Sequence, residues 1–384
     1  MSATVPAYDL APIFGILAAG LALALGPLVW FWFKRRGAPA AVRLRALALL
    51  TLFLSFDLVL LGTFTRLSDS GLGCPDWPGC YGHSSPLGAH GPIASAEAAV
   101  PTGAVTHTKA WIEMAHRYSA TAIGVLVIAL AVLATLERRR RRVGASPGWA
   151  IATVLWIVAQ GAFGALTVTM GLYPGIVTLH LLGGLGLLAL LAIQAEAYDP
   201  RLLSLPPALS SGLAVVAGLV LVQIALGGWV STNYAVLACR EFPTCQGAWW
   251  PDMNFAEAFV LRRPLGASGN GGFLPFSALT AIHMAHRIGA FVVLPAIVLL
   301  AWRLAAKGGP GARPWAQALA GVALWQLASG LANVLLGWPL VAAVAHSAGS
   351  AVLVVVLTIL LVRSWPFRQR VKSAWPAARR RLAS

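Results

Sequence analysis

Four histidines lie inside long apolar segments of this chain, two in each half: His116, His180, His286 and His346. Each lies about five to seven residues from one end of its predicted helix, which gives all four a similar depth. Ionisable side chains are costly inside a bilayer and usually serve a function there. A lone histidine of this kind is more often a hydrogen-bonding partner between helices. Four at matched depth predict the axial ligands of two buried haem groups, each iron held by two neutral imidazoles.

A carboxylate accompanies only the first of these histidines. Glu113 precedes His116 by three residues, whereas His283 stands at the matching position before His286. Because residues three apart share a helical face, we predict that Glu113 points into the same pocket as His116. There it would serve as an acid or base in an oxidation that releases protons. The alternative is an exposed carboxylate that favours the helix N-terminus.

An arginine follows the first histidine of each half. Arg117 and Arg287 are predicted to pair with haem propionates, because a guanidinium binds a carboxylate at two points. The alternative is that both side chains simply extend to the membrane interface. His283, one turn before His286, is a further candidate ligand.

The elements that carry these residues are membrane spans. The 384 residues are 58% hydrophobic and 10% charged, with a mean hydropathy of +0.77, which excludes an ordinary soluble domain. Apolar runs of about 20 residues are long enough to cross a bilayer as helices. Nine such runs are predicted, at 10–33, 46–64, 111–136, 148–170, 176–197, 209–231, 278–302, 315–337 and 340–362.

The second half of the chain repeats the first. Gln160, Gly164 and His180 match Gln326, Gly330 and His346 at an offset of 166, and Asp57 matches Gln223 at the same offset. For Asp57 and Gln223 we predict a shared hydrogen-bonding role between helices. The repeat predicts an all-α membrane protein of two tandem four-helix bundles, related by a pseudo-twofold axis along the membrane normal, plus one extra N-terminal helix.

This duplication divides the chain into five predicted segments. Each bundle is expected to hold one haem beneath a long outer loop, and the carboxylate in only one of them suggests that one site does chemistry while the other carries electrons. The segments are the extra helix with a basic loop at 1–45, the first bundle at 46–197 with its outer loop 65–110, a linker at 198–208, the second bundle at 209–363 with its outer loop 232–277, and a basic tail at 364–384.

The positive charge follows the topology. The chain has a formal net charge of +16, and 21 of its 28 Lys and Arg residues fall in the four connections and the tail on one side of the nine spans. The positive-inside rule makes that side cytoplasmic, so the N-terminus is predicted to be periplasmic and the C-terminus cytoplasmic in a bacterial inner membrane. Membrane orientation thus explains the basicity, and no nucleic-acid partner is expected.

All four cysteines lie in the two outer loops, in two pairs that are each six residues apart: Cys74 with Cys80, and Cys239 with Cys245. In an oxidising space such short-range pairs favour disulfides. Free thiols or a metal site are the alternatives, although a zinc centre made only of cysteines usually has closer spacing.

Several motifs together resemble the haem A synthases. They are TRLSDSGLGCPDWPGC after the second span, EMAHR at 113–117, HLLGG at 180–184, HMAHR at 283–287 and the helix of His346, and the resemblance covers about 46–363. It implies an enzyme that oxidises the C8 methyl of haem O to a formyl group, giving haem A for cytochrome oxidase. It also implies that His116 and His180 hold the substrate, that Glu113 assists catalysis and that His286 and His346 hold haem b. The family's loop disulfide falls on Cys74 and Cys80.

The same resemblance implies partners. Haem O would be delivered by a haem O synthase, and the redox partner would be an electron donor that the sequence does not identify. The lipid bilayer would surround the chain, and a homo-oligomer is a further expected partner. The alternative function is a diheme b-type membrane electron-transfer protein. Such a relay needs no carboxylate at one haem only, and it usually places its haems on opposite sides of the membrane, whereas all four histidines here lie toward the outer side.

Overall fold

The structure, a computed structural model, describes residues 10–140, 147–269 and 272–364, and these residues form helices and loops but no β-sheet. The predicted basic tail from residue 365 onward lies outside the described residues. The long helices are α1 (Ala11–Arg35), α2 (Ala40–Leu67), α4 (His107–Arg139), α5 (Gly148–Thr169), α6 (Pro174–Tyr198), α7 (Pro207–Thr232), α9 (Phe276–Lys307), α10 (Arg313–Leu335) and α11 (Leu340–Arg363). Short elements in the connections are α3 (His90–Ala99), η1 (Ala235–Ala238), α8 (Phe255–Ala258) and η2 (Pro310–Ala312).

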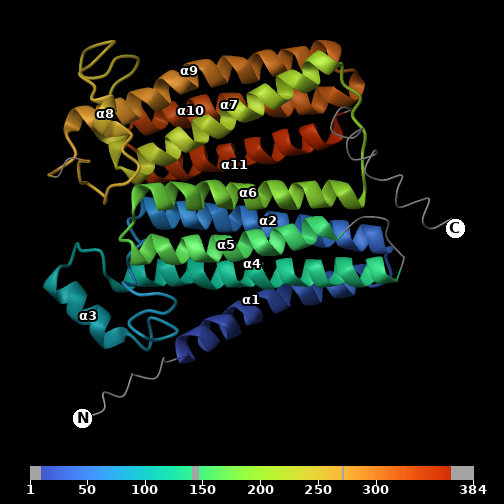
Figure 1. Cartoon of the computed structure of the whole chain (residues 1–384), viewed down its shortest axis with the longest axis horizontal. Helices are drawn as coiled ribbons and strands as arrows, with labels where there is room; N and C mark the ends of the chain where they lie inside the picture. The colour runs from blue at the N-terminus through green and yellow to red at the C-terminus, as the bar shows by residue number, and fades with distance from the viewer. Residues whose placement is uncertain (1–9, 141–146, 270–271, 365–384) are drawn as a thin grey trace.

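Two rings of four helices make up the body of the protein. In the first, α2 packs on α4, α4 on α5, α5 on α6 and α6 on α2; in the second, α7, α9, α10 and α11 repeat this order. The two rings lie side by side with their helices nearly parallel, and the long outer loops with α3 and α8 gather at one end (Figure 1). Nine of the described helices are long and apolar enough to cross a membrane, so the predicted all-α membrane fold is confirmed.

The helix starts differ from the predicted spans at two important places. α4 begins at His107, where the Thr106 hydroxyl caps it by accepting from the Lys109 amide, and α9 begins at Phe276 directly after Pro275. Both helices therefore extend beyond the apolar run that predicted them. His116 becomes the tenth residue of α4 and His286 the eleventh of α9, whereas the predicted spans made them the sixth and the ninth.

The two rings meet through α6, which packs on α7 and α11, and through α2, which packs on α11. At the outer end, Arg66 donates to the Ser231 carbonyl at 2.5 Å and lies over the ring of Tyr234, 4.0 Å from its centroid. The Tyr234 hydroxyl donates to Asp69 at 2.6 Å. Partial burial is the main reason that the pKa of Tyr234 is raised, which keeps this hydroxyl a donor at neutral pH.

At the opposite end, the last helix is tied back to the first ring. Arg363 of α11 donates from two nitrogens to Glu196 of α6, at 2.6 and 2.8 Å, and Glu196 is only 4% exposed. The Leu203 amide in the linker donates to the Arg363 carbonyl at 2.9 Å. A buried carboxylate bound at two points in this way is a strong, geometrically specific contact.

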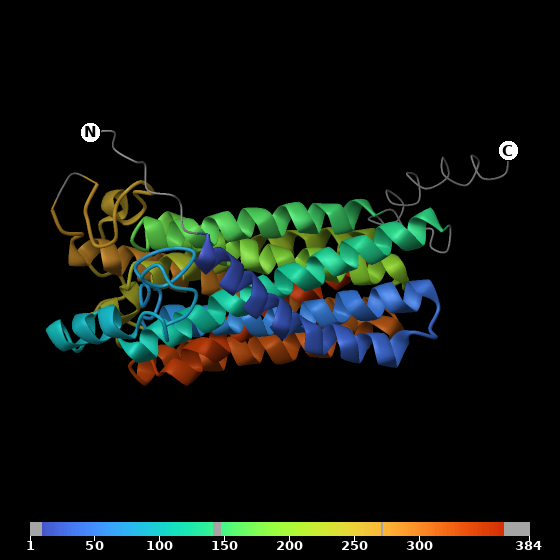
Figure 2. The ribbon, with the colours of Figure 1, turned by 90° about the horizontal axis from the view of Figure 1, so that it is seen from below.

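Helix α1 lies outside both rings. It packs mainly along α4 and hardly touches α2. Figure 2 shows it running obliquely across the other helices. The close approach needs Gly20, because a Cβ there would lie 2.4 Å from Thr121 Cγ2 of α4.

Candidate haem sites

Each of the four histidines packs its imidazole against a glycine of a neighbouring helix. A Cβ on the glycine would lie between 2.8 and 3.4 Å from the imidazole Cε1 in every case. The pairs are His116 with Gly62, His180 with Gly164, His286 with Gly227, and His346 with Gly330. The repeat therefore extends to the surroundings of the imidazoles, since in both halves a glycine lets an imidazole lie close to a helix backbone.

The two histidines of each ring come from helices that are diagonal in the ring, α4 and α6 in the first and α9 and α11 in the second. Diagonal helices are held apart by the two helices between them, so their side chains face each other across the interior of the bundle. His286 and His346 meet there with their ring centroids 6.4 Å apart, and His116 lies close enough to His180 to interact with it electrostatically. The structure thus brings together each pair that the sequence predicted.

This separation fits a haem iron between His286 and His346. A metal–imidazole bond of about 2 Å on each side, plus about 1.2 Å from each bonding nitrogen to its ring centre, puts the two centroids about 6.4 Å apart. The observed value is 6.4 Å, with the ring planes at 83° to each other. Imidazoles on opposite faces of one iron are a common form of haem ligation, and the residues here suit it.

The second pair of histidines is held by neighbouring side chains. The Ser329 hydroxyl donates to the Trp325 carbonyl at 2.7 Å, so its oxygen is free to accept a hydrogen bond from His346 Nδ1, 3.0 Å away. That contact leaves His346 Nε2 available for a metal. The side-chain amide of Gln223 lies 3.0 Å from His286 Nδ1 and donates to the His286 carbonyl at 2.9 Å.

The first pair has no such support among the described residues: His116 Nδ1 and His180 Nδ1 are both buried without a hydrogen-bond partner. Counting from the glycines explains the difference. Gln223 lies four residues before Gly227, whereas the position four residues before Gly62 holds Leu58. Likewise, Ser329 immediately precedes Gly330, whereas Phe163 immediately precedes Gly164. The first unit has apolar side chains where the second has polar ones.

The expected common role of Asp57 and Gln223 is therefore wrong. Gln223 bonds to His286, whereas Asp57 is exposed on α2 and has no hydrogen bond or ion pair with the part of the chain that the structure describes. The glycine contacts relate α2 to α7 by an offset of 165, one less than the offset that paired Asp57 with Gln223. A one-residue shift turns a side chain by about 100° around a helix, which is enough to move it to another face.

Glu113 is buried beneath the first outer loop, with 4% of its surface exposed. Its Oε2 accepts from the Cys74 amide at 2.8 Å, and its Oε1 accepts from Arg117 Nη2 at 2.5 Å. Both oxygens thus already have donors. The shared helical face with His116 led us to expect a carboxylate directed at the histidine pocket, but the contacts of Glu113 are with the loop and with Arg117.

The two arginines hold the two disulfide loops. Arg117 also donates to loop carbonyls within 76–79, the shortest contact being 2.5 Å to Gly79. Arg287 donates to the Thr244 and Cys239 carbonyls at 3.1 and 3.0 Å. A guanidinium has five N–H donors in a fixed fork, which suits it to gathering several carbonyls of one loop. The propionate role remains a prediction.

Both predicted cysteine pairs are disulfides, Cys74 with Cys80 and Cys239 with Cys245. Each closes a turn in which the second cysteine exchanges backbone hydrogen bonds with the residue three positions later. In the second loop, Glu241 accepts from the Gly247 amide, and this contact is the main reason that the pKa of its exposed carboxyl is lowered.

The remaining histidines have other surroundings. His283 Nδ1 lies 3.1 Å from the Ala235 carbonyl, so the residue that matches Glu113 also faces its outer loop. His83 and His90 are exposed, whereas His107 is half-buried at the start of α4, and its ring lies 4.6 Å from that of His90. Neither these histidines nor any other His, Cys, Asp or Glu side chains of the described residues form a group of three or more that could hold a metal ion.

The comparison with known families identifies the chain. The model of the COX15-CtaA family, described as cytochrome oxidase assembly protein, matches residues 45–358. The chain belongs to this family. The match to the COX15-CtaA family includes all four candidate ligands and all four cysteines but not α1.

Several curated relatives, all from bacteria, carry the same name. A protein named "Heme A synthase" from Shewanella oneidensis is 37% identical over 324 residues, which cover 82% of this chain and 95% of the relative. Proteins of the same name from Sphingopyxis alaskensis and Caulobacter vibrioides are 32% and 29% identical, over 79% and 84% of this chain and 86% and 95% of each relative. The similarity therefore extends along nearly the whole length of these relatives.

Sequence reasoning missed the supporting residues. Ser329 gave no signal, because a serine on an apolar helix usually bonds back to its own helix. The glycines were visible: Gly164 and Gly330 were matched in the repeat without being given a role. A glycine that recurs near a buried histidine in a neighbouring span is the signal that could have found the packing.

Proposed function

We propose that this protein is a haem A synthase, an enzyme that oxidises the C8 methyl of haem O to the formyl group of haem A. The observation that carries the proposal is a pair of facing histidines in each four-helix ring, with the second pair at the separation that one iron requires. The names of the relatives and the family support the same reaction.

The two sites differ in a way that suits different occupants. The second ring would hold haem b, a resident group that transfers single electrons when bound, because Ser329 fixes the His346 ring and Gln223 contacts the His286 ring. The first ring would hold haem O as substrate. His116 and His180 have no partner at Nδ1 among the described residues, so their rings can turn as substrate binds and product leaves.

Glu113 is proposed to accept a proton as the methyl group loses hydrogen. It lies one turn from His116, and the second ring has a histidine in its place. Arg117 and the Cys74 amide both donate to it, which fixes the orientation of the carboxyl group beneath the loop. Because the carboxylate is buried, reaching the substrate requires it to exchange one of these donors, so its action is coupled to the position of the first outer loop.

The proposed setting is the bacterial inner membrane, with the disulfide loops in the periplasm. The described basic connections lie at the opposite end of the helices from the disulfides, as the positive-inside rule requires for a cytoplasmic face. Haem O would come from a haem O synthase, and the electron partner is unassigned.

Pigment analysis tests the reaction. Protein purified from cells that make haem O should carry haem B together with haem O, haem A or an oxidised intermediate when the extract is resolved by chromatography. Haem B alone in both sites would favour the diheme electron-transfer alternative and overturn the proposal.

A substitution at Glu113 tests its role. Glu113→Gln keeps an oxygen for the Cys74 amide but removes the charge, so we expect both haems to be retained while methyl oxidation falls by about 10²-fold or more, the usual contribution of a proton-transfer group. Haem content and haem A formation are measured on the same preparation. The matched variant in the second ring, His283→Gln, should lose much less activity. Equal losses in the two variants, or loss of haem in Glu113→Gln, would contradict the proposed role.

A further inference from the structure

A pocket lies at the basic end of the helices, between α1, which the family match leaves uncovered, and the helices α2 and α4. α1 and α2 both pack on α4 but hardly on each other, although only Arg36 to Pro39 separate them. The two helices therefore diverge from their connection and leave a wedge whose floor is α4. Its cavity measures about 200 Å³.

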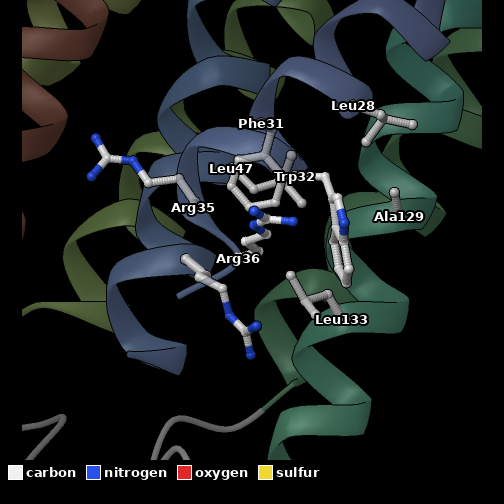
Figure 3. A pocket seen from close by; sticks show the side chains of 9 residues that line it. Leu28, Phe31, Trp32, Arg35, Arg36, Leu47, Ala129 and Leu133 are labelled. Atoms are coloured by element: carbon white, nitrogen blue, oxygen red, sulfur yellow. The ribbon is translucent and has the colours of Figure 1, made fainter. Parts of the chain in front are cut away.

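The walls of this pocket are apolar, and its rim is cationic. Phe31 and Trp32 of α1 face Leu133 of α4, and Leu28, Leu47 and Ala129 complete the walls (Figure 3). Arg35 and Arg36 lie on the other side of the space from Leu28, Ala129 and Leu133. A narrow apolar space that ends at guanidinium groups has the polarity of a lipid that carries a negative headgroup on a hydrocarbon chain.

The charges of the rim are not balanced by the protein. Arg43 is paired with Glu137 at 2.5 Å, but Arg35 and Arg36 form no ion pair with the described residues. Arg43 Nε is in addition buried without a hydrogen-bond partner among those residues. A buried donor that lines a pocket and lacks an acceptor indicates that the acceptor comes from a bound molecule.

We propose that this pocket binds one anionic phospholipid. Its phosphate accepts from Arg35, Arg36 and Arg43, and one acyl chain lies along Phe31, Leu47 and Leu133. The basic end of the helices is the side that the positive-inside rule assigns to the cytoplasm, where the leaflet carries anionic lipids. The lipid would fill the wedge between α1 and α2, where these two helices make few direct contacts. This proposal does not depend on the haem chemistry.

Lipid binding is measured by native mass spectrometry of the full chain in detergent, titrated with phosphatidylglycerol or with phosphatidylcholine of the same acyl chains. The wild-type protein should retain one phosphatidylglycerol in clear preference to phosphatidylcholine. Arg35→Gln with Arg36→Gln should weaken phosphatidylglycerol binding about fivefold per arginine, which corresponds to roughly 1 kcal/mol for each basic residue near an anionic lipid.

Two further variants separate the pocket from general charge. Arg303→Gln with Lys307→Gln removes two exposed cations from the same end of α9, far from the pocket in the helix order, and should leave the retained lipid unchanged. Ala129→Leu fills the floor without changing charge and should weaken binding of both lipids. An equal affinity for the two lipids in wild type, an unchanged affinity in the Arg35 and Arg36 variant, or an equal loss in the α9 variant would overturn the proposal.

Discussion

The two rings use the same helices and the same histidine–glycine contacts, but they hold their imidazoles differently. In the second ring Ser329 and Gln223 reach the Nδ1 atoms, whereas in the first ring both Nδ1 atoms are without partners in the described structure. A partner at Nδ1 fixes the orientation and tautomer of a metal-binding histidine. The comparison teaches that one fold can hold one histidine pair by hydrogen bonds and leave the other without them by changing only the neighbours of the imidazoles; for the proposed ligands this means a rigid pair and an adaptable pair.

The two outer loops show a related difference. Each ring joins its disulfide loop to the helix of its first histidine through an arginine, but only the first adds a carboxylate, Glu113, between the arginine and a cysteine amide. The second has His283 bonded to a carbonyl instead. The carboxylate that the proposed reaction needs is therefore present only in the first ring, while both loops are held by similar hydrogen bonds.

Removing one ligand from each ring should give the largest effect. His346→Ala deletes a ligand of the rigid pair, so we expect the protein to lose its b-type haem, seen as loss of haem B from the extract and of its visible spectrum. His180→Ala should instead reduce bound haem O and leave haem B in place. If His180→Ala empties the second ring as well, the two sites are not independent and the comparison fails.

A smaller effect is expected from removing the support of one ligand. Ser329→Ala deletes the acceptor of His346 Nδ1, and loss of such a partner typically weakens metal binding by about 10–100-fold. The measurements are the midpoint potential of haem B in the Ser329→Ala variant and the rate at which that variant loses haem B to a haem acceptor protein. The matched change Phe163→Leu removes no hydrogen bond and should alter haem O retention much less. Similar effects of the two changes would show that the first ring has a partner after all.

The smallest effect concerns the glycines. A Cβ at Gly227 would lie 2.9 Å from His286 Cε1, and one at Gly62 would lie 2.8 Å from His116 Cε1. Overpacking of this kind costs about 1–3 kcal/mol. Gly227→Ala should therefore reduce haem B retention by about tenfold, because Gln223 prevents the ring from turning away. Gly62→Ala should affect haem O less, since His116 can turn, and a larger loss there would reverse the comparison. Haem content after gel filtration measures both.

The sequence predicted the fold because its information is local. An apolar run long enough to cross a bilayer must form a helix, and two histidines per repeat at similar depth already indicate paired ligands. Where polar caps extend a helix, as at Thr106 before α4, hydropathy places the start too late, and the depth of His116 was underestimated for that reason.

The neighbours of the ligands could not be predicted in the same way. The contact of Glu113 with the Cys74 amide depends on how an outer loop folds back onto α4, which periodicity does not describe. Which residue of α2 corresponds to Gln223, the partner of His286, depended on the alignment of α2 with α7 to within one residue. Sequence matching aligned Asp57 with Gln223, and only the glycine contacts show that Leu58 takes that place.

The bond between Arg363 and Glu196 has a consequence for biogenesis. Glu196 belongs to the fifth long helix made by the ribosome, but its two-point partner belongs to the ninth. Until α11 is made, Glu196 lacks this two-point partner and, among the described residues, has only the longer ion pair with Arg45 of α2, at 3.9 Å. A chain truncated before its final span would therefore lack the bond that ties the second ring to the first at this end of the helices.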